Sequence, residues 1–167
     1  MNITNVTGDA FTHAQQLTVP AFAHGVNTSG VMGAGVAKTV RSHWPALYDT
    51  YRNMCSLDLL TPGNYMAWRT PRGGWVYNLA TQDAPGPRAR LGWVVQAVEN
   101  MCAHAQSVGV QEIVSVRIGC GIGGLSWTEV STALQGIPTS VTLIVADGKN
   151  TQSTSQTVNE HQSFTFA

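Results

Sequence analysis

The feature that most constrains this chain is a glycine-rich stretch at residues 24–37, which reads His-Gly-Val-Asn-Thr-Ser-Gly-Val-Met-Gly-Ala-Gly-Val-Ala. An apolar run leads into it, and a helical pattern begins at its end. Glycines in such a strand-to-helix turn let backbone N–H groups face an anion at the N-terminus of a helix. The stretch therefore predicts a strand, an anion-binding loop and a helix in succession, with the side-chain amide of Asn27 just ahead of the loop.

A second stretch, residues 117–126, repeats this design about ninety residues later and reads Arg-Ile-Gly-Cys-Gly-Ile-Gly-Gly-Leu-Ser. It follows a predicted strand, and Ser126-Trp-Thr-Glu129 is the pattern of a capping box, which predicts a helix directly after the glycines. Two phosphate-sized loops in one small chain indicate a ligand that contains a diphosphate.

The rest of the sequence predicts an α/β fold. Its strands and amphipathic helices suggest a three-layer α/β/α sandwich around a mixed central sheet of about six strands. Ligands of such sheets bind at the C-terminal ends of the strands, where both glycine stretches fall. We expect strands at residues 2–7, 18–26, 63–69, 75–81, 112–118 and 141–146, and helices at 36–43, from 45, at 90–108 and from 126.

Composition limits the classes of partner. Nine basic and nine acidic residues cancel, so the chain lacks the basic surface of a protein whose main partner is nucleic acid. At 167 residues we expect one domain, residues 1–148, followed by a polar and flexible tail at 149–167. We also expect a monomer.

Cysteine content and hydropathy indicate a cytoplasmic protein. The three cysteines are odd in number and form no Cys-x-x-Cys pair, which argues against disulfides and a structural zinc site and fits a reducing compartment. No signal-peptide pattern and no apolar run of about 18 residues is present, so we expect no contact with a membrane. No metal or cofactor is expected.

A rival motif lies within the second stretch, because residues 119–124 satisfy the Gly-x-Gly-x-x-Gly pattern and Asp147 follows at a distance suited to a ribose-binding acid. A nicotinamide-dependent oxidoreductase of the Rossmann type is thus a remote alternative. The motif comes too late in the chain, since a single helix and strand follow it where a Rossmann fold needs several further units.

Taken together, three motifs give the chain a resemblance to the macrodomains, which are ADP-ribose-binding α/β modules. The motifs are Gly8-Asp9 after the first strand, residues 24–37, and residues 117–127. The resemblance spans about residues 1–147 and is greatest to the subclass that contains ADP-ribosyl-glutamate hydrolases and ADP-ribose-1''-phosphate phosphatases.

This resemblance implies a position for the ligand. Asp9 would accept a hydrogen bond from the adenine amino group, although taken alone it is equally a helix N-cap. The first loop would wrap the diphosphate and the distal ribose, and the second would close over the proximal phosphate. The residues expected to contact ADP-ribose or a derivative are Asp9, Ala10, Asn27, Gly30, Val31, Met32, Gly33, Ala34, Gly35, Val36, Thr81, Gln82, Gly119, Cys120, Gly121, Ile122, Gly123, Gly124 and Leu125.

Catalysis is where the chain departs from the subclass. Its hydrolases use a lysine after the fourth strand and an aspartate in the second loop, and the matching positions here are Gln82 and Gly123. Neither residue supplies an amine nucleophile or an acid–base group. His24, which phosphatase-like members also carry, and Asp83 are the remaining catalytic candidates, and each has a plain structural alternative: a buried strand histidine and a turn aspartate.

The sequence leaves two main functions open. The chain is either a binding module for free ADP-ribose, an ADP-ribosylated protein or a signalling nucleotide, or a hydrolase. The hydrolase would remove ADP-ribose from proteins or phosphate from ADP-ribose-1''-phosphate through His24, Asp83 or a positioned water.

Overall fold

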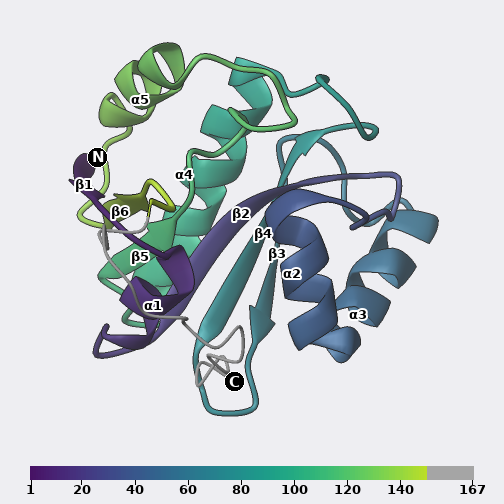
Figure 1. Cartoon of the computed structure of the whole chain (residues 1–167), viewed down its shortest axis with the longest axis horizontal. Helices are drawn as coiled ribbons and strands as arrows, with labels where there is room; N and C mark the ends of the chain where they lie inside the picture. Colours follow the sequence, from purple (N-terminus) through teal and green to yellow (C-terminus); the bar gives the residue numbers. More distant parts are fainter. Residues whose placement is uncertain (150–167) are drawn as a thin grey trace, which may run out of the picture.

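The computed structural model of the chain describes residues 1–149, which form one six-stranded sheet with helices on both faces (Figure 1). In chain order the elements are β1 (Asn2–Val6), α1 (Ala10–Gln15), β2 (Ala21–Asn27), α2 (Gly35–His43), α3 (Pro45–Ser56), β3 (Tyr65–Arg69), β4 (Trp75–Gln82), α4 (Leu91–Ser107), β5 (Glu112–Ser115), α5 (Trp127–Gln135) and β6 (Thr142–Ala146).

The sheet has the strand order β1-β6-β5-β2-β4-β3 and is mixed. β3 pairs with β4 in an antiparallel hairpin, and the other four pairings are parallel. The predicted mixed sheet of about six strands is therefore confirmed. This order differs from the 3-2-1-4-5-6 arrangement of a Rossmann fold, which removes the structural basis for the oxidoreductase alternative.

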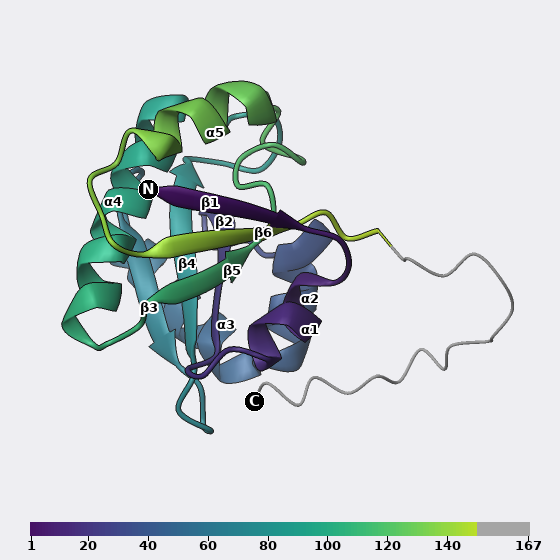
Figure 2. The same cartoon turned by 90° about the vertical axis from the view of Figure 1, so that its left-hand side faces the viewer.

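Three layers result from the placement of the helices. α1, α2 and α3 cover one face of the sheet, and α4 and α5 cover the other (Figure 2). β2 lies in the middle of the sheet, so Phe22 packs toward the first group of helices while Ala21 and Ala23 pack toward the second. Burial on both faces explains why the sequence of β2 is a nearly continuous apolar run.

Four local predictions are wrong in detail. α1 was not expected, because its six residues are too few to give a helical period, and Asp9 caps it. β2 begins at Ala21 rather than at residue 18, after Pro20. β5 ends at Ser115, three residues earlier than expected. α5 starts as predicted after Ser126, but the Ser126 side chain makes no capping hydrogen bond.

The predicted polar tail lies outside the described residues except for Lys149. Within residues 1–149, no helix combines the length and the apolar character that a membrane span requires. The division into a domain at 1–148 and a tail stays a prediction.

The core on the α4–α5 face should contribute strongly to the stability of the fold. Leu143 in β6 is fully buried, whereas Leu59 after α3 is 61% exposed. We expect Leu143→Ala to lower the free energy of unfolding by roughly 2–5 kcal/mol, since it removes buried methyl groups and leaves a cavity. The matched control Leu59→Ala should change it by less than about 0.5 kcal/mol. Urea denaturation of both variants measures the difference, and equal effects would contradict this assignment of the core.

Candidate ligand-binding site

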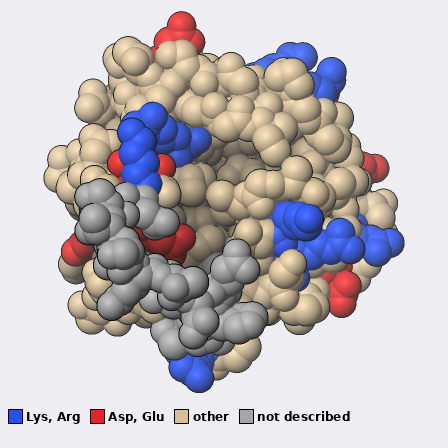
Figure 3. Space-filling model, in the orientation of Figure 1, with Lys and Arg blue, Asp and Glu red and all other residues tan. Residues whose placement is uncertain are grey.

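A cavity of about 820 Å³ opens at the C-terminal ends of the parallel strands. In the space-filling view a hollow lies near the centre of the face, with uncharged residues around most of it and both basic and acidic groups at its margins (Figure 3). The volume is within the range of small-molecule sites. Within the described chain, the lining residues are His24, Gly25, Val26, Asn27, Val31, Gly33, Ala34, Gly35, Val36, Ala37, Thr81, Gln82, Pro85, Gly86, Val116, Arg117, Ile118, Gly119, Cys120, Gly121, Ile122, Gly123, Leu125, Trp127, Ala146, Asp147, Gly148 and Lys149.

The first wall is the loop from Asn27 to Gly35, and hydrogen bonds of the Asn27 amide fix its shape. Asn27 Nδ2 donates to Val31 O at 2.8 Å, and its Oδ1 accepts from Ser29 N at 3.0 Å. The hydroxyl of Tyr51, a fully buried α3 residue, lies 2.9 Å from the same Oδ1 and 2.7 Å from Asn27 O. Asn27 thus lines the cavity, but its side chain holds the loop.

The loop ends at the N-terminus of α2. Ala34 is the N-cap and provides no side-chain hydrogen bond to the first turn, so the initial backbone N–H groups are not capped by it. Gly35 has a φ of +60°, which a residue with a side chain rarely adopts. This geometry presents N–H donors and the positive end of a helix dipole to the cavity without any lysine.

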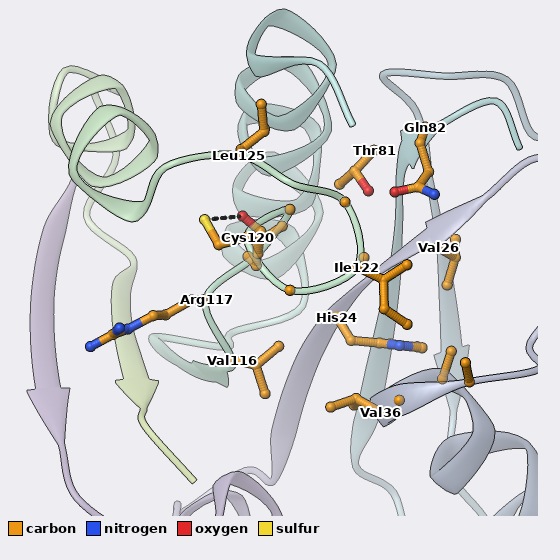
Figure 4. A pocket seen from close by; sticks show the side chains of 18 of the residues that line it. His24, Val26, Val36, Thr81, Gln82, Val116, Arg117, Cys120, Ile122 and Leu125 are labelled. Atoms are coloured by element: carbon orange, nitrogen blue, oxygen red, sulfur yellow. Dashed lines mark hydrogen bonds between the residues drawn. The ribbon is translucent and has the colours of Figure 1, made fainter. Parts of the chain in front are cut away.

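The second wall is a compact loop from Gly119 to Leu125. Leu125 N donates to Gly119 O at 2.9 Å and Gly124 N to Gly121 O at 3.2 Å, so the loop closes on itself. Ile122, which is 55% exposed, lies at its tip and points toward His24 and Val36 (Figure 4). A Cβ placed on Gly35 would lie 3.5 Å from Ile122 Cδ1, so the tips of the two glycine loops nearly meet.

Gln82 and Gly123 both have structural roles beside the cavity. Gln82 Nε2 donates to Ala84 O at 2.7 Å and to Gly86 O at 2.9 Å, which folds the loop after β4. A Cβ on Gly123 would lie 2.7 Å from Gly119 O and 2.8 Å from Ala89 Cβ. No side chain, and hence no aspartate, fits at residue 123 in this loop.

His24 lies in β2 at the floor of the cavity and is buried. Its Nε2 is 2.7 Å from Asn78 Oδ1. Because Asn78 Nδ2 donates to Met66 O and Val76 O, Oδ1 is the acceptor and Nε2 carries the proton. Nδ1 then has a lone pair with no partner within residues 1–149. Burial lowers the pKa of His24 to about 4, against the weaker opposing effect of the Asn78 hydrogen bond.

Asp83 does not line the cavity. Its carboxylate forms a bidentate ion pair with Arg88, with Nε–Oδ1 2.6 Å and Nη2–Oδ2 2.7 Å. The hydrogen bond from Arg88 lowers the pKa of Asp83, so the carboxylate is ionised and already occupied at neutral pH.

Most of the residues expected to bind the ligand line the cavity, and five do not. Asp9 accepts hydrogen bonds from Thr12 N at 2.8 Å and Thr12 Oγ1 at 3.0 Å, so it acts as the N-cap of α1. Ala10 and Met32 are buried in the core on the face of the sheet that α1, α2 and α3 cover. The other two are Gly30 and Gly124. A role for these five in binding stays a prediction.

Cys120 lies in the second wall and contacts Ile118 O through its Sγ at 3.4 Å. Burial raises the pKa of its thiol, which disfavours the nucleophilic thiolate. Cys120 is therefore a packed wall residue.

Sequence reasoning missed the far end of the cavity. There Val116, Arg117 and Trp127 meet the segment that follows β6, including Asp147 and Lys149. The sequence did offer one signal for this end. The residues that follow two neighbouring parallel strands lie at the same edge of the sheet, so those after β5 and β6 could have been expected to meet.

Comparison with known proteins identifies sequence relatives. No family model matches the chain. A DNA ADP-ribosyl glycohydrolase of Thermus aquaticus is 29% identical over 120 residues, which cover 70% of this chain and 33% of that protein. The ADP-ribose glycohydrolase OARD1 of Homo sapiens is 24% identical over 135 residues, which cover 81% and 83%. The chain thus spans about a third of the Thermus protein's length.

Solved structures share the fold. The macrodomain of Thermus aquaticus DarG is 25% identical, with a TM-score of 0.71 over 87% of this chain and 97% of that one. Thermosipho africanus DarTG in complex with ADP-ribose is 20% identical, with a TM-score of 0.75 over 90% of this chain and 43% of that one.

The buried neutral His24 predicts a pH-dependent stability. Its pKa is lower in the folded chain than the ordinary value of 6.5, so the unfolded chain binds more protons between about pH 6.5 and 4. Stability should fall as the pH decreases through this window, by about 3 kcal/mol from this group. Denaturation curves of the protein and of His24→Gln at several pH values measure the contribution. Parallel pH profiles for the two proteins would contradict it.

Proposed function

This chain is a macrodomain in fold, and we propose that its cavity binds ADP-ribose, either free or attached to another molecule. The observation that carries the proposal is the opposition of two glycine loops across one cavity, at the C-terminal ends of β2 and β5. Their backbone N–H groups and the start of α2 suit a diphosphate. The similar DarTG structure, which is described as a complex with ADP-ribose, supports the same ligand.

The cavity has two ends on either side of these loops. One end is formed by Asn27, Thr81, Gln82 and Gly86 and would hold the distal ribose. The other end, near Val116 and the segment after β6, would hold the adenosine. A neutral chain can hold this anion because backbone donors, and not lysines, face the phosphates.

We infer that the site captures its ligand and does not cleave it by the lysine-dependent route of the hydrolase subclass. Gln82 is not a nucleophile, and both hydrogens of its amide are used by Ala84 and Gly86. The backbone and Ala89 around Gly123 leave no space for an acidic side chain. The two positions at which the subclass carries catalytic groups are thus structural here.

The two remaining catalytic candidates are also poorly suited to proton transfer. A histidine with a pKa of about 4 is a weak base at neutral pH, and the Nε2 proton of His24 is held by Asn78. The Asp83 carboxylate is paired with Arg88 away from the cavity. Hydrolysis remains the alternative function, supported by the glycohydrolase names of the sequence relatives.

The molecule that carries the ADP-ribosyl group is a separate question. The relatives include a DNA ADP-ribosyl glycohydrolase, whereas the neutral charge of this chain argues against nucleic acid as its main partner. ADP-ribosylated protein, exclusion of nucleic acid, a monomeric state and a cytoplasmic location all stay predictions. Parallel binding to an ADP-ribosylated peptide and an ADP-ribosylated oligonucleotide would separate the two carriers.

Gly35→Glu should abolish binding of ADP-ribose. The side chain would start 3.5 Å from Ile122, on a left-handed backbone, and its carboxylate would enter the space proposed for the diphosphate. The matched control is Gly92→Glu, because a Cβ at that exposed position in α4 meets nothing within 4 Å. Calorimetry should show a loss of affinity of more than about 100-fold, or about 2.7 kcal/mol, for the first variant. Retained affinity would refute the pose.

Turnover should be absent. We expect the protein to release no ADP-ribose from a glutamate-linked peptide or an ADP-ribosylated oligonucleotide, and no phosphate from ADP-ribose-1''-phosphate, above the rate without enzyme. Chromatography of the products measures this, with a hydrolase of known activity on each substrate as positive control. If turnover occurs and is lost in His24→Gln or Asp83→Asn, the hydrolase function replaces capture.

A further inference from the structure

The charged residues that line the cavity within residues 1–149 gather at one end. They are Arg117 after β5, and Asp147 and Lys149 after β6. In the pose proposed above, this is the adenosine end, away from the loops that face the diphosphate. Plain ADP-ribose presents only ribose hydroxyls and the base there, so this charge exceeds what that ligand requires.

Arg117 connects the cavity to a second hollow. Its side chain runs away from the loop of residues 118–125 and toward β6 and β1 (Figure 4). A hollow of about 130 Å³ lies there, and Arg117 and Asp147 line both spaces. The second hollow is completed by Asn5, Val6 and Thr7 at the end of β1, and by Val145 in β6. It therefore extends the adenosine end of the site outward.

Neither Arg117 nor Lys149 forms a salt bridge within the described chain. The ion pair found in residues 1–149 is that of Arg88 with Asp83, and neither Arg117 nor Lys149 lies within 4 Å of an acidic oxygen. Asp147 is the nearby acid. Its Oδ1 accepts hydrogen bonds from Gly8 N at 3.1 Å and Lys149 N at 2.8 Å. These hydrogen bonds, and to a smaller extent the positive charges of Lys149 and Arg117, lower the pKa of Asp147, so its one negative charge partly offsets the two positive charges.

We propose that this hollow is a subsite for an additional phosphate group on the adenosine ribose of the ligand. Arg117 would contact that phosphate from the wall of the hollow, where Asn5 and Thr7 also carry side-chain donors. Lys149 lines the adjoining cavity and not the hollow, and it would approach the phosphate from that side. The proposal rests on the proposed function, because it uses the orientation of ADP-ribose in the cavity. The planar guanidinium of Arg117 suits a tetrahedral oxyanion, to which it can donate two parallel hydrogen bonds.

The chemistry fits a phosphomonoester more closely than a hydroxyl. A hydroxyl at this place gains a neutral hydrogen bond, whereas a phosphate gains charge-assisted bonds from both cations. The negative charge of Asp147 reduces the gain in affinity. Because its carboxylate is held beside Gly8, it also keeps the phosphate away from that side of the hollow. The phosphate can stand on the 2' or the 3' oxygen of the ribose, which are neighbouring positions on one ring.

The test compares the dissociation constants of ADP-ribose and 2'-phospho-ADP-ribose by calorimetry on the full chain. For the unaltered protein we expect the phosphorylated ligand to bind about tenfold more tightly at low salt. In Arg117→Gln the ratio should fall to about one, and in Lys149→Gln it should fall part of the way. The ratio should also decrease as salt increases. The matched control is Arg72→Gln, which removes an arginine in the turn between β3 and β4 at the opposite end of the sheet and should keep the full ratio.

Competition with adenosine 2',5'-bisphosphate and adenosine 3',5'-bisphosphate then identifies the position of the phosphate. Stronger competition by either compound than by AMP, lost in Arg117→Gln, supports the subsite and names the oxygen. A ratio of one in the unaltered protein, together with no advantage of either bisphosphate over AMP, overturns the subsite, while binding of ADP-ribose upholds the proposed function. A preference that persists in both Arg117→Gln and Lys149→Gln also overturns it. If neither ADP-ribose nor its phosphorylated form binds, the proposed function itself fails.

Discussion

The site depends on the parallel pairing of β2 with β5 in the middle of the sheet. Phe22 pairs with Val114 and Ala23 with Ser115, so both strands end at the same edge. The loops that follow them must therefore open toward the same space, although their sequences lie about ninety residues apart. The long connection between them, which contains α2 to α4 and the β3–β4 hairpin, fills both faces of the sheet. Without this one pairing, each glycine stretch would be a separate turn with no opposing wall.

The loops keep their shape because buried polar groups hold them from behind. Tyr51 and Asn27 share hydrogen bonds behind the first loop, and Gln82 folds the segment that follows β4. Thr28 N donates to Gln82 O and Ser29 Oγ to Asp83 O, so these two segments are joined to each other. Removing one partner of such a buried network leaves another polar group unsatisfied, which is costly. The shape of these two walls therefore depends on hydrogen bonds within the chain.

Much of the fold could be predicted from the sequence, because the apolar periods of α3 and α4 and the apolar run of β2 report burial directly. α1 could not, since a six-residue helix has too few positions for a period and depends on its Asp9 cap. The two walls of the site could also be predicted, because each is one continuous glycine-rich stretch of the sequence. The meeting of Arg117 and Lys149 at one end of the cavity was not predicted, because the β5–β6 pairing brings them together and neither carries a local signal. The ion pair with Arg88 holds the Asp83 carboxylate away from the cavity, and the positions of the two residues in the sequence do not predict that pair.

The same contacts that shape the cavity also explain why residues 82 and 123 do not carry the lysine and the aspartate of the hydrolase subclass. The Gln82 amide donates hydrogen bonds to Ala84 O and Gly86 O. A lysine at residue 82 could not make both hydrogen bonds and still keep its amine free as a nucleophile. A side chain at residue 123 would meet Gly119 O and Ala89, so the second loop closes tightly only with glycine there. His24 is held in one tautomer by Asn78, whose own amide is fixed by two backbone carbonyl groups. The Gln82 amide nitrogen and His24 Nε2, at the end of the cavity proposed for the distal ribose, are thus used in hydrogen bonds within the wall. Arg117 and Lys149 at the other end form no salt bridge within residues 1–149, and this asymmetry supports the proposal that charge recognition occurs at that end of the cavity.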